Sequence, residues 1–177
     1  KIRGTVQAPP EFKAMYPAVE TAYQLGTRYG EETLVPSREK RKRDFRAATT
    51  CMDASIGKIL DALDRKGFAD NTIVIFFADN GGGGPADNGA LRGGKGDTWE
   101  GGGRVLSIIR WPAGGIPAGV ENGAFLPGME LLPSLAAATG AQLPQGVVID
   151  GYNWWPTLRG ETESPRQDMF WKRRGLR

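Results

Sequence analysis

Apolar residues recur at three- and four-residue steps between Arg38 and Lys66, whereas they form an unbroken run from Ile73 to Ala78. The first pattern predicts an amphipathic helix, and Gly67 follows it where a helix C-cap favours glycine. The second run is β-branched and aromatic without alternation, which is typical of a strand covered on both faces in a parallel sheet. A helix, a short turn and a buried strand form half of a β-α-β unit, so the pattern indicates an α/β fold.

Two further elements are predicted downstream. The stretch Val105 to Trp111 reads as a second strand, and Met129 to Thr139 reads as a short amphipathic helix that ends at Gly140. Residues 141–165 are loop-like, and we expect their large side chains to pack against a core; these side chains are Trp154, Trp155 and Leu158.

The remaining segments show no period. Residues 1–37 carry prolines and scattered aromatic residues, so we expect a loop there, with at most a short helix around Pro17 to Tyr23. Residues 81–103 are rich in glycine. A loop of that length within a compact domain is usually functional or disordered, so this one is the first place to look for a site.

Composition narrows the class of protein. The 177 residues are 40% apolar and 24% charged, and no apolar run is long enough for a membrane span. The net charge of +3 is too small to argue for a nucleic-acid partner, and the basic run Arg38 to Arg46 reads either as a solvated helix face or as a patch for a polyanion. A single cysteine, Cys51, excludes an internal disulfide, and there is no histidine to act as a general base or metal ligand.

Asp79 and Asn80 follow the predicted strand directly. In open α/β sheets, ligands lie beyond the carboxyl ends of the strands. A carboxylate and an amide carbonyl offer two hard oxygens, which calcium and magnesium prefer over the ligands that suit zinc. The same Asp-Asn-Gly sequence is also common in a simple turn, and these residues alone do not decide between the two interpretations.

Lys95 lies within Gly-Gly-Lys-Gly, where the glycines allow the backbone to approach a ligand closely. A lysine ammonium is a compact charge that suits sulfate or phosphate, although a mobile surface loop with an exposed lysine fits equally well. The stretch Gly89 to Gly96 also imitates a phosphate-binding P-loop. We reject that interpretation because Gly96 lacks the hydroxyl that the motif needs, and poor helix formers follow.

Four motifs follow one another along the chain: D-N-G-G from Asp79, L-R-G-G-K-G from Leu91, W-E-G-G-x-R-V from Trp99 and R-W-P from Arg110. In this order they resemble the sulfatase family. The resemblance extends over roughly residues 45–175, upstream through M-D-A-S-I-G-K-I-L-D-A-L and downstream through P-G-M-E-L-L-P-S-L and I-D-G.

The resemblance implies an alkaline-phosphatase-like α/β sandwich with a mostly parallel sheet flanked by helices, and hydrolysis of sulfate esters. In the family, a formylglycine made from Cys or Ser attacks sulfur, and a calcium ion holds that group. Carried over by motif, Asp79 and Asn80 would be calcium ligands, and Lys95 would contact the sulfate and stabilise the leaving oxygen. The implied substrate is a sulfate-ester small molecule or glycan, with no nucleic acid, and export from the cell would fit the family.

The chain departs from the family pattern at the nucleophile. The motif C-x-P-S-R is imitated only by Leu34 to Arg38, where Leu34 cannot become formylglycine, and Cys51 lies within the predicted helix without the motif around it. The upstream aspartate ligands and catalytic histidines have no counterpart. We therefore expect formylglycine in a part of the protein that precedes this chain, and an incomplete calcium site here.

These departures predict a C-terminal portion of a longer sulfatase. Residues 1–160 would belong to the catalytic domain, and residues 161–177 would begin a C-terminal subdomain. Alone, the chain is expected to bind calcium weakly and not to turn over. The alternatives are a phosphoryl or phosphonate ester hydrolase of the same superfamily, or a non-catalytic module that cradles an anion in its glycine loop.

Overall fold

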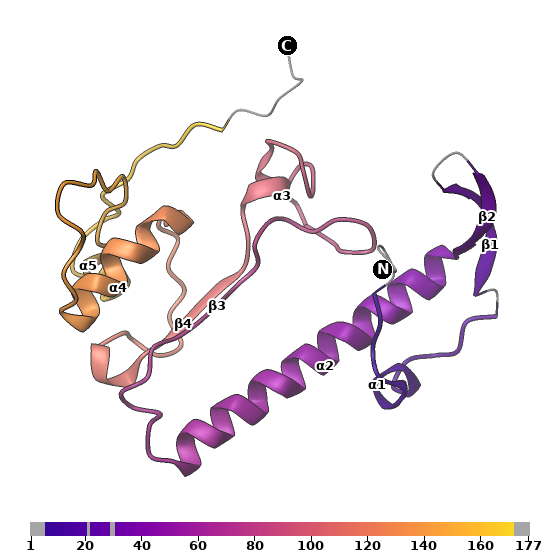
Figure 1. Ribbon diagram of the computed structural model, residues 1–177, viewed down its shortest axis with the longest axis horizontal. Coiled ribbons are helices and arrows are strands. Elements are labelled where there is room, and N and C mark those ends of the chain that lie inside the picture. Colours follow the sequence, from indigo (N-terminus) through magenta and orange to yellow (C-terminus); the bar gives the residue numbers. More distant parts are fainter. Residues whose placement is uncertain (1–5, 21, 29–30, 172–177) are drawn as a thin grey trace. The chain divides into compact units, whose positions relative to one another are not determined.

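A computed structural model describes residues 6–20, 22–28 and 31–171 (Figure 1). The chain divides into two compact units. The N-terminal unit contains the residues up to Lys66 together with Ala78–Leu106, and the C-terminal unit contains Gly67–Phe77 and the residues from Ser107 onward. The candidate site residues all lie in the N-terminal unit.

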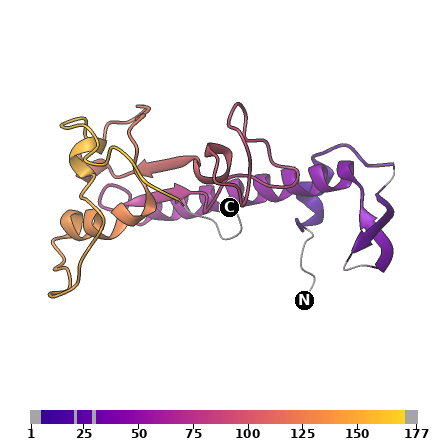
Figure 2. The same ribbon diagram turned by 90° about the horizontal axis from the view of Figure 1, so that it is seen from above.

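Helix α2, Arg38–Arg65, is the longest element and runs without a break in both views (Figures 1 and 2). The Ser37 hydroxyl caps its start by accepting a hydrogen bond from the Lys40 amide at 3.1 Å. Its C-cap is Lys66, and Gly67 follows with φ +72°. The predicted helix and its glycine stop are confirmed.

The segment before α2 corrects the prediction of a loop. A short helix, α1 (Pro10–Ala14), begins earlier than expected, and two strands, β1 (Tyr23–Arg28) and β2 (Glu31–Pro36), pair as an antiparallel hairpin. Pro10 stands at the first turn of α1, where a missing amide hydrogen costs nothing, so it does not break the helix. The hairpin escaped prediction because the cross-strand ladder stabilises strands whose own pattern is too weak to identify them.

In the C-terminal unit, β3 (Val74–Phe77) pairs with β4 (Ser107–Arg110), which confirms both predicted strands to within about two residues. Their pairing is antiparallel, with Val74 opposite Arg110 and Phe77 opposite Ser107. The two sheets of the described residues are thus both antiparallel pairs, and no parallel pairing occurs in them. Phe77 and Ile108 remain 46% and 55% exposed, so within these residues the strands are not covered on both faces as the apolar run predicted.

The predicted helix near residue 130 is confirmed. A 3₁₀ turn, η2 (Gly128–Glu130), leads into α4 (Leu131–Thr139), and Gly140 ends it in the left-handed conformation with φ +72°. The 3₁₀ turn η1 (Pro112–Gly114) and the one-turn helix α5 (Trp155–Leu158) complete the unit. Trp154 and Trp155 are buried, as expected, and Leu158 is half-buried.

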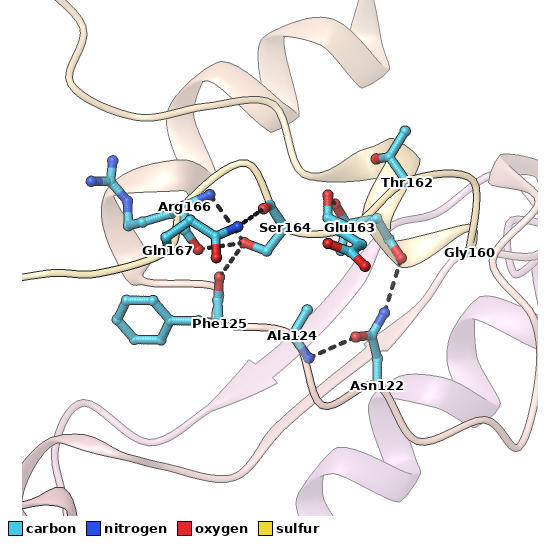
Figure 3. Close-up of a pocket in the computed structure, with 10 residues that line it drawn as sticks. Asn122, Ala124, Phe125, Gly160, Thr162, Glu163, Ser164, Arg166 and Gln167 are labelled. Carbon is cyan, nitrogen blue, oxygen red and sulfur yellow. Dashed lines mark hydrogen bonds between the residues drawn. The ribbon is translucent and has the colours of Figure 1, made fainter.

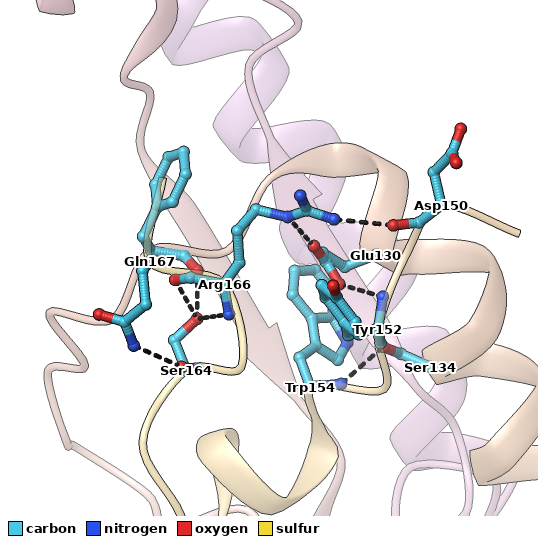
Figure 4. A network of polar contacts seen from close by, with 9 residues as sticks. Glu130, Ser134, Asp150, Tyr152, Trp154, Ser164, Arg166 and Gln167 are labelled. Carbon is cyan, nitrogen blue, oxygen red and sulfur yellow. Dashed lines mark hydrogen bonds and ion pairs between the residues drawn. The ribbon is translucent and has the colours of Figure 1, made fainter. Parts of the chain in front are cut away.

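In the C-terminal unit, a network of hydrogen bonds surrounds the buried side chain of Glu130 (Figure 4). One Glu130 oxygen accepts a hydrogen bond from Arg166 Nε at 2.5 Å, and the other accepts from the Tyr152 amide. Arg166 also donates to the Asp150 carbonyl at 2.8 Å. The hydrogen bond to Glu130 raises the pKa of Arg166, because it favours the charged form of the guanidinium.

No helix of the described residues has the length and apolar character needed to cross a membrane.

Candidate functional site

The loop from Ala78 to Leu106 returns on itself at its base. The Ala78 amide donates to the Leu106 carbonyl at 3.3 Å, and the Gly81 amide donates to the Gly102 carbonyl at 2.9 Å. A single helical turn, α3 (Glu100–Gly103), lies on its returning arm. The expectation of an aperiodic loop is confirmed, but the loop is tied together by backbone hydrogen bonds.

Asp79 and Asn80 begin the outgoing arm of this loop. Asp79 is exposed, and Asn80 is half-buried with its amide nitrogen donating to the Gly81 carbonyl at 2.9 Å. Among the described residues, neither the Asp79 carboxylate nor the Asn80 side-chain oxygen has a hydrogen-bond or ion-pair partner. Both oxygens therefore remain open to a ligand.

Lys95 lies on the returning arm, directly beside the outgoing one. Its amide donates to the Gly82 carbonyl at 3.0 Å. A Cβ built on Gly83 would lie 2.9 Å from the Lys95 Cβ, so the stem of the lysine passes over a glycine. The main chain of Lys95 is thus brought to the second residue after Asn80, and its exposed ammonium has no partner within the part of the chain that the structure describes.

Asn88 holds the two arms together, and the sequence analysis missed it. Its side-chain oxygen accepts from the Gly82 amide at 2.8 Å, and its nitrogen donates to the carbonyls of Gly82 and Gly93, each at 3.0 Å. An asparagine in a glycine-rich loop gives no signal of this role, because its partners are backbone groups set by the fold. We assign Asn88 as a positioning residue.

Asp97 also orders the loop. Its carboxylate accepts a hydrogen bond from the Gly94 amide at 2.9 Å, one residue before Lys95. Gly96 follows the lysine with φ +93°, a conformation that side chains other than glycine rarely adopt. The backbone on both sides of Lys95 is therefore fixed.

The returning arm passes so close to its neighbours that Gly101 and Gly102 leave no room for a Cβ atom. A Cβ on Gly101 would lie 2.2 Å from the Gly93 carbonyl oxygen and 2.7 Å from that of Arg92. The Arg92 side chain stacks on the exposed Trp99 ring with 3.6 Å between guanidinium carbon and ring centroid. This is a cation–π contact on the exposed side of the arm.

A hollow of about 340 Å³ borders the same loop. Asn80 lines it together with Asn88 and Arg104, whereas Asp79 and Lys95 are not among its lining residues. Arg104 is held toward Glu100 by an exposed ion pair of 3.3 Å. The side-chain amide of Asn80 and the guanidinium of Arg104 therefore line the same hollow.

The residues that imitate a nucleophile have structural roles. Ser37, in the Pro-Ser-Arg imitation of the family motif, is buried and caps α2. Cys51 is half-buried on α2. Neither lies in the glycine loop, and the expectation that formylglycine belongs to another part of the protein stays a prediction.

The donor set of the loop is sparse for a metal. No group of three or more His, Cys, Asp or Glu side chains in the described residues is arranged to hold an ion. Asp79 and Asn80 supply one carboxylate and one amide oxygen, a chemistry that fits a hard cation such as calcium. Calcium takes about six to eight oxygens, so these two residues fit part of a site.

The C-terminal unit has a separate hollow of about 440 Å³ (Figure 3). Hydrogen bonds from Asn122 to the Thr157 carbonyl and from Ser164 to the Phe125 carbonyl join the segments around it. None of the sequence-predicted site residues lines it.

Comparison with known proteins gives a consistent result. The family model described as Sulfatase matches residues 5–141. Rat (Rattus norvegicus) steryl-sulfatase is 38% identical over 129 residues, which cover 67% of this chain and 22% of that protein. Human (Homo sapiens) arylsulfatase A is 42% identical over 127 residues, covering 67% and 24% respectively. A sulfatase of Formosa agariphila is 31% identical over 173 residues, covering 90% and 31%.

Solved structures agree with the sequence relatives. The crystal structure of Ps i-CgsB in complex with k-i-k-neocarrahexaose superimposes with a TM-score of 0.74 at 29% identity, over 92% of this chain and 32% of that one. The chain therefore spans between about a fifth and a third of the length of the proteins that it matches. With a family model over most of its length and relatives above 30% identity, the chain belongs to the sulfatase family.

Proposed function

We propose that this chain supplies part of the active site of a sulfuric ester hydrolase. Asp79 and Asn80 are the calcium ligands in this proposal, and Lys95 is the catalytic residue that binds the sulfate. The observation that carries it is the return of the loop, in which the Lys95 amide bonds the Gly82 carbonyl at 3.0 Å, two residues after Asn80. Residues 15 apart in sequence are thereby held on neighbouring arms.

The metal half of the proposal rests on two oxygens without partners in the described residues, on Asp79 and Asn80. A bound calcium would polarise a sulfate oxygen and offset negative charge on it. The remaining ligands, and the formylglycine, belong to other parts of the complete protein. This chain alone then binds calcium weakly and does not turn over.

The lysine half rests on preorganisation. The Lys95 ammonium is exposed, while its backbone is fixed by Gly82 and by the Asp97 bond to the preceding residue. A cation held in place before the reaction costs no reorganisation when charge develops on the leaving oxygen, and such a group contributes several kcal/mol. Asn88 acts through the loop and not on the substrate.

The proposal extends to the fold and the substrate. In this proposal the partly exposed strands β3 and β4 join a mostly parallel sheet in the complete domain. Residues 1–160 belong to the catalytic domain, and residues 161–177 begin a C-terminal subdomain. The substrate is a sulfated glycan or a small sulfate ester. The complex of a similar structure with a neocarrahexaose supports the glycan.

The test uses the complete enzyme with a matched pair of aryl esters, p-nitrophenyl sulfate and p-nitrophenyl phosphate. We expect hydrolysis of the sulfate ester, and a loss of roughly 10²–10³ in kcat for Lys95→Ala. Lys58→Ala, which removes an exposed lysine from α2, is the control and should behave as wild type. Preferential hydrolysis of the phosphate would identify a phosphoryl hydrolase of the same superfamily, and no hydrolysis of either would favour the binding module.

Calcium is tested by a measurement that does not depend on turnover. Titration calorimetry of the complete enzyme should show weaker calcium binding for Asp79→Ala, with Asp87→Ala as the control from the same loop. Equal calcium affinity in Asp79→Ala and wild type would remove Asp79 from the ligand set.

A further inference from the structure

The first two and a half turns of α2 have two faces of opposite character. One face packs within the N-terminal unit, where Ala47 is fully buried and Arg43 donates to the Lys13 carbonyl at 3.0 Å. Lys40 on this face forms an ion pair with buried Asp44, so its charge is neutralised. This side of the helix is fixed against α1.

The other face carries four exposed cations, which we call the basic stripe: Arg38, Arg41, Lys42 and Arg46. At 3.6 residues per turn they span an arc of about 140°, centred half a turn away from Ala47, and extend ~12 Å along the axis. One exposed acid, Glu39, lies at its margin.

The charges of the stripe are not neutralised within the described part of the unit. None of its four side chains forms an ion pair there. Arg41 donates to the Pro36 carbonyl at 2.7 Å, which orients its guanidinium and leaves the full charge in place. The stripe is therefore a rigid row of unpaired cations, because the helix that carries it is fixed by its opposite face.

We propose that the basic stripe binds an anionic polysaccharide carrying several sulfate groups. The proposal rests on the proposed function in one respect, the choice of a sulfated glycan as the polyanion. Four cations spread over ~12 Å exceed the reach of one tetrahedral anion, so the partner is a polymer with repeated charges.

Single-stranded nucleic acid fits the stripe less well. Proteins that bind it combine cations with exposed aromatic rings on which bases stack. The stripe itself contains no aromatic residue, and the nearby Phe45 is half-buried. Charge without stacking favours a polysaccharide, whose sugar–sulfate chain is recognised mainly through its charges.

The function of such a stripe is to retain a polymeric substrate. A chain bound there raises the effective concentration of its other sulfate groups at the enzyme. Small sulfate esters carry a single charge and gain nothing from the stripe. The stripe should therefore lower KM for polymers and leave small-ester hydrolysis unchanged.

The experiment compares fluorescein-labelled dextran sulfate with unsulfated dextran, using the complete protein and fluorescence polarisation across a range of salt. The test variant is Arg38→Gln/Lys42→Gln/Arg46→Gln. The control, Lys58→Gln/Arg65→Gln/Lys66→Gln, removes the same charge from exposed positions near the other end of α2, so both variants lower the net charge of this chain from +3 to 0. Circular dichroism verifies that both retain their helix.

We expect wild type and control to bind dextran sulfate alike and unsulfated dextran not at all. The stripe variant should bind at least about tenfold more weakly, with a salt slope reduced by about two to three. Its kcat and KM for p-nitrophenyl sulfate should equal those of wild type. Equal binding by the two triple variants would overturn the proposal, and so would tighter binding of a DNA duplex or single strand than of dextran sulfate.

The two proposals fail separately. If the wild-type protein hydrolyses p-nitrophenyl sulfate but does not bind dextran sulfate, the stripe proposal alone is contradicted. If the wild-type protein binds dextran sulfate but hydrolyses no sulfate ester, the esterase proposal alone is contradicted.

Discussion

The glycine loop of the N-terminal unit and the Glu130 network of the C-terminal unit are ordered in different ways. The loop has exposed side chains and is tied by backbone amides, Asn88 and Asp97. The network is built on buried side chains, with Glu130, Ser134 and Trp155 each almost inaccessible. The candidate site thus depends on hydrogen bonds that fix its shape, whereas the scaffold depends on burial, which supplies most of the stability.

The largest effect should come from the buried region. Trp155 is 2% exposed, packs edge-on against Trp111 at 5.3 Å between ring centroids, and donates its indole N–H to the Ser134 carbonyl. Trp155→Ala should lower the free energy of unfolding by about 3–5 kcal/mol in chemical denaturation. The exposed Trp99 is the control, since Trp99→Ala loses only a cation–π contact of about 0.5–1 kcal/mol. Similar losses of unfolding free energy in the two variants would show that burial does not contribute more to stability in the C-terminal unit than in the loop.

A smaller effect is expected from crowding in the loop. Gly101→Ala places a methyl group 2.2 Å from the Gly93 carbonyl and should cost about 1–3 kcal/mol in thermal denaturation. Gly103→Ala, in the same helical turn, meets no atom within 4 Å and should leave the melting temperature at or above that of wild type. A reversed order of the two variants would contradict the close approach of the arms.

The smallest change in global stability should come from Asn88→Ala, about 1 kcal/mol, because the loop lies outside the core. Its local effect is larger. The Gly82 amide, which donates to the Asn88 side chain at 2.8 Å, should lose protection in hydrogen exchange, while core amides keep theirs. Asn122→Ala is the control, since Asn122 bridges backbone groups in the other unit. Unchanged exchange at Gly82 would mean that Asn88 does not hold the arms.

Local pattern was sufficient where an element's stability is local. The helix at residues 38–65 follows from its apolar spacing and its stop at Gly67, and the helix at 131–139 follows from its own spacing and Gly140. The strands at 74–77 and 107–110 follow from short β-branched runs. Residue order alone also identified the family, through Asp79, Asn80 and Lys95 in their glycine-rich setting.

Tertiary structure decided what depends on partners distant in sequence. Three features consist of hydrogen bonds between segments whose composition does not predict their pairing. They are the hairpin at residues 23–36, the antiparallel pairing of β3 with β4, and the contacts of Asn88 with both arms of the loop. Tertiary structure also decided how the basic run at residues 38–46 is used. The face with Ala47 and Arg43 packs within the unit, and the basic stripe lies on the opposite, exposed face. Sequence sets local preference and charge, but the choice among long-range partners is made by the burial and hydrogen bonding of the folded chain.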